Sequence, residues 1–253
     1  MTPAAPAPDQ AYFFDVDGTL IHLAAAPGLA RAADWVGPAL AALHDRTGGA
    51  LALVSGRPLR ELDALLPAAG WAAAGQHGLE WRAPDGSLHR PPPPAALEPA
   101  REALADLVAR HPALLLEDKG LSLALHYRRA PRLAGFAHRA VRQLATQLGP
   151  ELVVQTGKRV IELRPAGQDK GAAVRRFLAL PPFRGRRPVF LGDDVTDEAA
   201  FGAVNALGGH SIKVGRGPTA ARWRLAGVDD VRAWLAGDAA PLRPASSPDR
   251  RTA

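Results

Sequence analysis

The sequence predicts an α/β protein whose core is a doubly wound parallel sheet, with a smaller α+β domain inserted into that core. Continuous apolar segments such as 50–54 and 188–191 are typical of buried parallel strands, and segments with helical spacing separate them. The composition changes at the four prolines of 91–94, which form a semi-rigid spacer. We therefore assign residues 11–95 and 165–240 to the core domain and residues 96–164 to the inserted domain.

The core elements alternate along the chain, and this order places helices on both faces of the sheet. A hairpin with the turn Pro84-Asp85-Gly86 ends the first half of the core. The ends of the chain, 1–10 and 241–253, are expected to be disordered. The other core elements are strands at 12–14, 50–54, 72–74, 188–191 and 211–214, and helices at 38–46, 59–66, from Gly171, after Glu198, near Thr219 and near Val228.

The inserted domain repeats one pattern twice: an amphipathic helix followed by two short strands. The predicted helices span 96–110 and 131–148. The predicted strands are 114–117 with 121–127, and 152–155 with 160–163.

Polar clusters stand where core strands end or core helices begin. Asp15 and Asp17 follow the first strand, Ser55-Gly56-Arg57 follows the second, Lys170 opens a helix, and Asp193-Asp194 follows a later strand. Each has an ordinary alternative: a solvated Asp-Gly turn, a helix cap, a surface lysine or an acidic helix start. Ligands of doubly wound sheets bind at the carboxyl ends of the strands, so we expect the four clusters to form one site.

The chemistry that suits this set is phosphoryl transfer. Asp15 is the candidate nucleophile, forming an aspartyl-phosphate, and Asp17 is the candidate general acid and base. Residues two apart in an extended segment point to the same side, and two carboxylates held that close favour a hard cation such as Mg²⁺. Ser55 and Lys170 would hold the remaining phosphoryl oxygens.

The metal ligands expected from the sequence are Asp15, Asp17, Asp193 and Asp194, with Asp17 contributing its backbone carbonyl. Thr19 and Asp197 are expected to orient the ligands from behind. An EF-hand is excluded, because Ala26 stands where the closing glutamate would have to be.

The motifs Asp15-Val16-Asp17-Gly18-Thr19, Ser55-Gly56-Arg57, Lys170 and Gly192-Asp193-Asp194 resemble, in order, the four signatures of haloacid dehalogenase (HAD) phosphatases. Gly75-Gln76-His77-Gly78 and the inserted-domain motifs at 117–120, 125–128 and 157–162 resemble, more narrowly, those of bacterial trehalose-6-phosphate phosphatases. This resemblance implies a HAD-like core with a C2-type cap domain, Mg²⁺ as cofactor, and trehalose 6-phosphate as substrate. It also suggests a functional link to trehalose-6-phosphate synthase.

The resemblance also assigns residues to substrate binding. Beside Gly56 and Arg57 in the core, it places Gln76 and His77 near the phosphate or at a closing interface. Charged side chains of both signs suit sugar hydroxyls. The substrate-binding residues expected in the inserted domain are Glu117, Lys119, His126, Arg128, Lys158 and Glu162.

Composition limits the class of protein. The net charge is +6 and the pI is about 10.4, but the densest basic cluster is only Arg184-Gly185-Arg186-Arg187, so we expect no nucleic-acid partner. A positive field suits an anionic small-molecule substrate better. The chain contains no cysteine and no apolar run of membrane-spanning length, so we expect a cytoplasmic protein that does not bind membranes, and we expect a monomer.

Two alternatives remain at this point. The chain could be a HAD-type phosphatase for another sugar phosphate, such as sucrose phosphate or mannosylglycerate phosphate. It could also be a catalytically silent subunit that binds sugar phosphate and regulates a partner. A pure binding module has no need of Asp17 or of a second carboxylate cluster, which argues against the second alternative.

Overall fold

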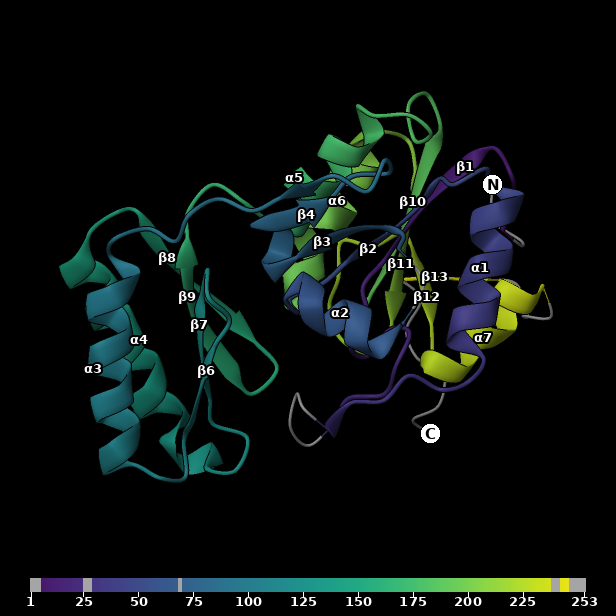
Figure 1. The fold of residues 1–253 in the computed structure, drawn as a ribbon. Helices are drawn as coiled ribbons and strands as arrows, with labels where there is room; N and C mark the ends of the chain where they lie inside the picture. Colours follow the sequence, from purple (N-terminus) through teal and green to yellow (C-terminus); the bar gives the residue numbers. More distant parts are fainter. Residues whose placement is uncertain (1–5, 25–28, 68–69, 238–241, 246–253) are drawn as a thin grey trace, which may run out of the picture. The chain divides into compact units, whose positions relative to one another are not determined.

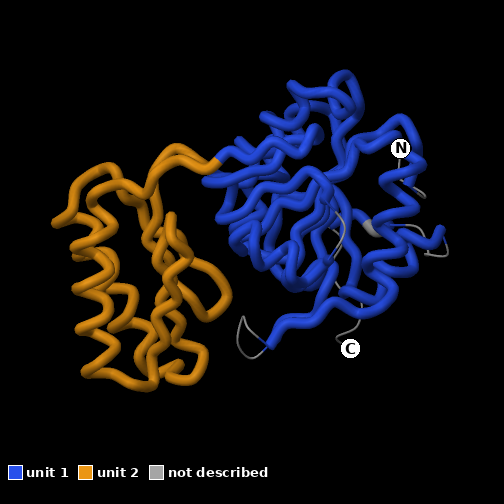
Figure 2. The backbone as a smooth tube through the Cα atoms, in the orientation of Figure 1, with its two compact units in different colours: residues 1–89, 169–253 blue, residues 90–168 orange. Residues whose placement is uncertain are grey.

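The computed structural model of the chain describes residues 6–24, 29–67, 70–237 and 242–245. The chain forms two compact units, which Figure 2 shows in different colours: residues 1–89 with 169–253, and residues 90–168. The larger unit is therefore built from both ends of the sequence. The predicted fold class, an α/β parallel sheet with an inserted α+β unit, is confirmed.

The larger unit is organised around a nine-stranded sheet in the order β13-β12-β11-β10-β1-β2-β3-β4-β5. The six central strands are parallel: β1 (Gln10–Phe14), β2 (Leu51–Val54), β3 (Ala72–Gly75), β10 (Arg187–Gly192), β11 (His210–Val214) and β12 (Trp223–Leu225). The edge strands pair antiparallel: β4 (Glu80–Arg82), β5 (Leu88–His89) and β13 (Arg243–Pro244).

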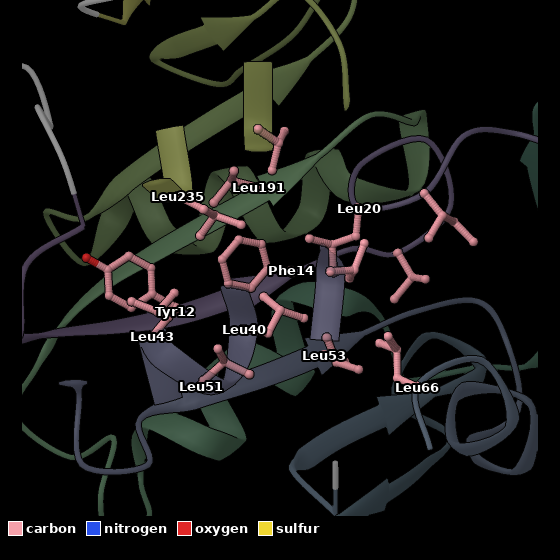
Figure 3. Packing of buried hydrophobic residues seen from close by; sticks show 14 of the residues in the cluster. Tyr12, Phe14, Leu20, Leu40, Leu43, Leu51, Leu53, Leu66, Leu191 and Leu235 are labelled. Atoms are coloured by element: carbon pink, nitrogen blue, oxygen red, sulfur yellow. The ribbon is translucent and has the colours of Figure 1, made fainter. Parts of the chain in front are cut away.

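Helices cover both faces of this sheet, because alternate strand residues point to opposite sides. Tyr12 and Phe14 face one side and join a core with α1 (Val36–Arg46), α2 (Leu59–Leu65) and α7 (Val228–Ala236). Figure 3 shows Tyr12 and Phe14 among the leucines of this core, including Leu40, Leu43 and Leu235. Phe13 faces the other side, toward α5 (Lys170–Leu178) and α6 (Glu198–Ala206). The result is the three-layer arrangement visible in Figure 1.

The order of the strands fixes where a site can form. The chain adds β2 and β3 on one side of β1, whereas β10, β11 and β12 lie on the other side. The direction of winding therefore reverses between β1 and β10, which pair in parallel from Gln10 with Arg187 to Phe14 with Leu191. Ligands bind at the carboxyl ends of the strands beside such a reversal, where Asp15 and Asp193 stand here.

Three expectations about the larger unit were wrong. The helix expected near Thr219 is absent from residues 219–222, and strand β12 follows there instead, too short for its sequence to show alternation. Residues 6–10, expected to be disordered, include the start of β1, and the Ala7 N–H donates to the Tyr12 hydroxyl. Residues 241–253 were also expected to be disordered, but Leu242 is buried and β13 pairs with β12. The rest of the two predicted disordered ends, residues 1–5, 241 and 246–253, lies outside the described residues.

The smaller unit is a four-stranded antiparallel sheet in the order β6-β7-β9-β8, with two helices. The sheet consists of β6 (Leu115–Asp118), β7 (Leu123–His126), β8 (Leu152–Gly157) and β9 (Val160–Pro165), and the helices are α3 (Leu97–Arg110) and α4 (Ala134–Leu148). Leu123, Leu125, Ile161 and Leu163 share an apolar core with both helices, which cover one face of the sheet (Figure 1). The other face carries the polar residues described below.

Among the described residues, no helix combines the length and the apolar character that crossing a membrane requires.

Candidate active site

Three buried aspartates from separate parts of the chain meet at the reversal point of the sheet. Asp15 follows β1, Asp193 follows β10, and Asp197 ends the 3₁₀ turn Val195–Asp197 that precedes α6. Their exposed fractions are 4%, 5% and 0%, and one carboxylate oxygen of each lies within 4.8 Å of the others. Carboxylates that lie this close together and are shielded from water repel one another strongly. Positive charge nearby must therefore compensate them.

Lys170, the first residue of α5, supplies one of these cations. Its Nζ lies 2.7 Å from Asp15 Oδ1 and 2.7 Å from Asp197 Oδ1. Burial alone lowers the pKa of this ammonium group, but Asp15 and Asp197 outweigh burial and raise it. Burial, helped by Asp197 and Asp193, raises the pKa of the Asp15 carboxyl well above its usual range, while Lys170 opposes that rise. The single ammonium group of Lys170 therefore compensates only part of the negative charge that three carboxyl groups can carry.

Both carboxylate oxygens of Asp197 accept hydrogen bonds from other groups of the protein. Oδ1 accepts the hydrogen bond from Lys170, and Oδ2 accepts the backbone N–H groups of Asp193 and Asp194, at 2.9 Å each. The carboxylate also packs against the backbone of Gly192, where an added Cβ would lie 2.4 Å from Asp197 Cγ. Asp197 therefore connects Lys170 to the loop after β10, and its orienting role toward the metal ligands stays a prediction.

The donor set suits a hard metal ion. Asp15 and Asp193 offer only oxygen atoms, and Asp15 Oδ2 accepts no hydrogen bond from the described part of the chain. Gly18 makes room for this arrangement: its φ is +85°, and a Cβ there would lie 2.1 Å from Asp193 Oδ2. The cluster of three aspartates could therefore hold a metal ion.

The Asp17 carboxylate pairs with an arginine and does not join the three aspartates. Its two carboxylate oxygens accept hydrogen bonds from Arg57, from Nε at 2.6 Å and from Nη2 at 2.7 Å, a bidentate pair. Arg57 Nη1 also lies 3.2 Å from Glu61 of α2. The Asp17 carboxylate is not part of the cluster of three, so the backbone carbonyl of Asp17 is the atom that remains a candidate metal ligand. Arg57, for which the resemblance predicts substrate binding, holds this carboxylate.

The structure does not bring two predicted residues into the cluster. Asp194 caps the turn Val195–Asp197, where its side chain accepts the N–H of Asp197, so its carboxylate is directed to the backbone. Thr19 is fully buried, and its hydroxyl makes no hydrogen bond with any described residue, so nothing ties it to an acid. Asp193 and Asp194 are adjacent in sequence, and the loop geometry alone decides which of them faces Asp15.

Ser55, Gly56 and the turn Gln76–Gly78 form one side of the site. Ser55 is buried, its Oγ accepts the N–H of Arg57 at 3.1 Å, and its carbonyl accepts the N–H of His77 at 2.9 Å. The His77 ring packs on Gly56, where an added Cβ would lie 2.8 Å from His77 Cε1. Gln76 is also buried, and its side chain donates to Glu80. The Gln76 side chain, predicted to lie near the phosphate or at a closing interface, thus makes a hydrogen bond with Glu80 inside the larger unit.

Four of the residues predicted in the smaller unit lie on or beside the sheet face opposite α3 and α4. Glu117 pairs with Ala124, and Ala124 pairs with Glu162, so the two glutamates share that face. Lys119 Nζ lies 3.1 Å from Glu162 Oε2, and His126 Nε2 lies 2.6 Å from Glu117 Oε2. Burial raises the pKa of Glu117, but His126 and Lys119 outweigh burial and lower it. The face therefore presents two carboxyl groups beside an ammonium group and an imidazole.

Two predicted residues lie at the ends of strands. Arg128 follows β7 and is half-buried, and Lys158 is exposed in the turn between β8 and β9.

Comparison with known proteins assigns this architecture to a family. A family model described as trehalose-phosphatase matches residues 13–229. The chain belongs to the trehalose-phosphatase family. The phosphatase class, expected from the motifs, is thereby confirmed.

Relatives support the assignment over most of the chain. The trehalose-6-phosphate phosphatase of Escherichia coli K12 is 45% identical over 228 residues, which are 89% of this chain and 85% of the relative. A probable trehalose-phosphate phosphatase of Sinorhizobium fredii is 43% identical over 205 residues, 81% of this chain and 77% of the relative. The C-terminal domain of the C. albicans trehalose-6-phosphate phosphatase matches with a TM-score of 0.81 over 91% of both chains, and at 22% identity this shows a shared fold.

This trehalose-phosphatase also has residues at the site that sequence reasoning missed. Lys213 of β11 is buried, and its Nζ donates to the carbonyl oxygen of Asp193 at 2.6 Å. Glu80, the first residue of β4, is buried and accepts a hydrogen bond from the side chain of Gln76. A charged residue inside an apolar strand, as in Ser211-Ile212-Lys213-Val214, was the available signal for Lys213.

Proposed function

We propose that this trehalose-phosphatase hydrolyses trehalose 6-phosphate to trehalose and phosphate with Mg²⁺ as cofactor. The observation that carries the proposal is the buried cluster of Asp15, Lys170, Asp193 and Asp197, in a chain 45% identical to a trehalose-6-phosphate phosphatase. Bound at Asp15, Asp193 and the backbone carbonyl of Asp17, Mg²⁺ would neutralise charge on the nucleophile and on the phosphoryl oxygens.

In this proposal Asp15 is the nucleophile. One of its oxygens attacks phosphorus and forms an aspartyl-phosphate as the bond to the sugar oxygen breaks. Lys170 holds the attacking carboxylate through Oδ1, and the ammonium is also placed to attract a phosphoryl oxygen. Ser55, on the neighbouring strand end, is the proposed donor to another oxygen.

Asp17 is the proposed proton carrier. It gives a proton to the leaving sugar oxygen in the first step, and in the second it takes one from the water that attacks the aspartyl-phosphate. Arg57 holds this carboxylate at two points, so the proton is delivered from a fixed direction. The cycle ends with Asp15 again a free carboxylate and with Asp17 again carrying its proton.

We propose that the polar face of the smaller unit binds the sugar. Support comes from the resemblance to the cap motifs and from the shared face of Glu117, Lys119, His126 and Glu162. Carboxylates accept hydrogen bonds from sugar hydroxyls, and ammonium groups donate to their oxygens. Arg128 and Lys158 are further candidates on the same resemblance.

We further propose that the enzyme is a cytoplasmic monomer that acts after a trehalose-6-phosphate synthase. The location is supported by the absence of cysteine from the sequence, which is typical of a chain that needs no oxidising compartment.

The test is phosphate release from a panel of sugar phosphates: trehalose 6-phosphate, glucose 6-phosphate, sucrose phosphate and mannosylglycerate phosphate. We expect kcat/KM for trehalose 6-phosphate to exceed the others by about 10²-fold or more, because polar contacts left unpaired by a wrong sugar are costly. EDTA should abolish turnover and excess Mg²⁺ should restore it. The Asp15→Asn variant, purified identically, is the control for contaminating phosphatases.

Two results would contradict the proposal. Preference for another member of the panel would assign the same chemistry to a different sugar. Binding of trehalose 6-phosphate without turnover, in the presence of Mg²⁺, would indicate a catalytically silent subunit.

A further inference from the structure

Glu80 is a buried carboxylate to which no role has been assigned. It begins β4 and is 4% exposed. Its Oε1 accepts the backbone N–H of Leu59 at 3.0 Å and the side-chain amide of Gln76 at 3.1 Å. A carboxylate removed from water needs such donors, and a buried polar network of this kind fixes the groups it joins.

The two groups that Glu80 holds lie on either side of Arg57. Leu59 is the first residue of α2, two residues after Arg57. Gln76 donates its backbone N–H to the Arg57 carbonyl at 2.9 Å. Gly75 packs against the same place, where an added Cβ would lie 2.9 Å from both the Arg57 carbonyl oxygen and the Leu59 nitrogen. The backbone of Arg57 is thus held from both sides.

The turn that contacts Arg57 has an unfavourable backbone. Gln76 and His77 have φ values of 46° and 60°, in the left-handed region that residues with a side chain seldom adopt. Such a conformation persists only where surrounding contacts enforce it. The hydrogen bond from the Gln76 side chain to Glu80 is one of these contacts, and the packing of His77 on Gly56 is another.

Arg57 connects this network to the reaction. Its guanidinium makes the bidentate pair with Asp17, across 40 residues of sequence. A bidentate pair transmits position as well as charge, because two parallel hydrogen bonds fix direction. A shift of the Arg57 backbone would therefore move the Asp17 carboxylate.

We propose that Glu80 is a positioning residue for Asp17. It holds Gln76 and the start of α2, these hold Arg57, and Arg57 aims the Asp17 carboxylate at the leaving oxygen of the substrate. The inference rests on the proposed function, in which Asp17 protonates that oxygen. Glu80 itself touches no reacting atom.

The test uses leaving groups of different basicity. A sugar alkoxide is a strong base and must be protonated as it leaves, whereas p-nitrophenolate leaves without a proton. We expect Glu80→Ala to lower kcat/KM for trehalose 6-phosphate about 10- to 100-fold, part of the full effect of general acid catalysis. For p-nitrophenyl phosphate, kcat/KM should change less than about 3-fold, within the ordinary context dependence of such effects. A general loss of folded enzyme would lower both equally.

A double-mutant cycle gives an independent readout. Because Glu80 acts through Arg57, Glu80→Ala should cause no further loss when added to Arg57→Ala. Glu80→Gln keeps an oxygen acceptor at the same place and should restore most of the activity. Asp63→Ala is the matched control: Asp63 of α2 pairs with Arg82 of β4, so it removes another tie between the same two elements without touching Arg57. It should leave kcat/KM unchanged for both substrates.

Equal losses with both substrates, or additive losses in the cycle, would overturn the positioning role. If Glu80→Ala does not fold, Gln76→Leu removes the side-chain donor alone and should show the same selective loss for the sugar substrate; an unselective loss there would also overturn it. Failure of the proposed function is distinguishable, because the wild-type enzyme would then not hydrolyse trehalose 6-phosphate at all.

Discussion

Replacing Asp15 with Asn should lower turnover of trehalose 6-phosphate by about 10⁴-fold or more, as expected for loss of a covalent nucleophile. The amide keeps the shape of the carboxyl group and can still accept the hydrogen bond from Lys170, but it cannot attack phosphorus. The melting temperature and the circular dichroism spectrum should stay close to those of the wild-type protein. Steady-state phosphate release, measured with Mg²⁺ present, checks the prediction.

The chain offers a matched control for this substitution. Asp45 lies on α1 with a side chain that is 85% exposed, and its Oδ1 lies 3.5 Å from Nδ1 of the neighbouring His44. Asp45→Asn makes the same chemical change far from the cluster and should leave turnover unchanged. Turnover by Asp15→Asn within about tenfold of wild type would remove Asp15 as nucleophile, since nucleophile loss is far larger.

The largest effect on stability should come from Asp197→Ala. The substitution leaves Lys170 without one of its two carboxylates and leaves the N–H groups of Asp193 and Asp194 without their acceptor, all in a buried place. Removing one partner of a buried ion pair typically costs about 3–5 kcal/mol. The free energy of unfolding, from urea denaturation followed by tryptophan fluorescence, should fall by about that amount.

An exposed pair gives the comparison. Asp63→Ala breaks an ion pair with Arg82 at 2.7 Å, but the Asp63 side chain is 48% exposed, so the expected cost is below about 1 kcal/mol. If Asp197→Ala and Asp63→Ala lower the free energy of unfolding equally, the buried network does not hold the site together.

The sequence predicts much of the site because the fold places residues by topology. Asp15, Lys170 and Asp193 are 155 and 23 residues apart along the chain, yet each stands at the end of a strand or the start of a helix beside the reversal point. Once the alternating pattern of strands and helices is recognised, the carboxyl ends of the strands must share one edge. Their convergence could therefore be expected without coordinates.

Side-chain partners could not be predicted in the same way. Nothing in Asp193-Asp194 indicates that the first faces Asp15 while the second caps a turn, because Asp197 sets the loop by accepting both N–H groups. Nothing in Ser55-Gly56-Arg57 indicates that the arginine pairs with Asp17. These choices depend on contacts between side chains and backbone groups that only the folded structure brings together.

The short strands at one edge of the sheet could not be predicted from the sequence pattern either. Strand β12 has three residues and β13 has two, so neither is long enough to show alternation between faces. Their pairing depends on the neighbouring strand β11, which presents a free edge to β12. Tertiary context decides such elements, whereas longer segments such as α1 and β10 follow from their own periodicity.

The central claim is that Asp15 carries the phosphoryl group during hydrolysis of trehalose 6-phosphate. The most direct measurement is acid quenching during turnover, reduction with borohydride, and peptide mass spectrometry, because borohydride converts an aspartyl-phosphate to homoserine. We predict homoserine at position 15 only in samples that contained both substrate and Mg²⁺, and none in the Asp15→Asn variant. Phosphate release at the wild-type rate with homoserine at another aspartate would contradict the account.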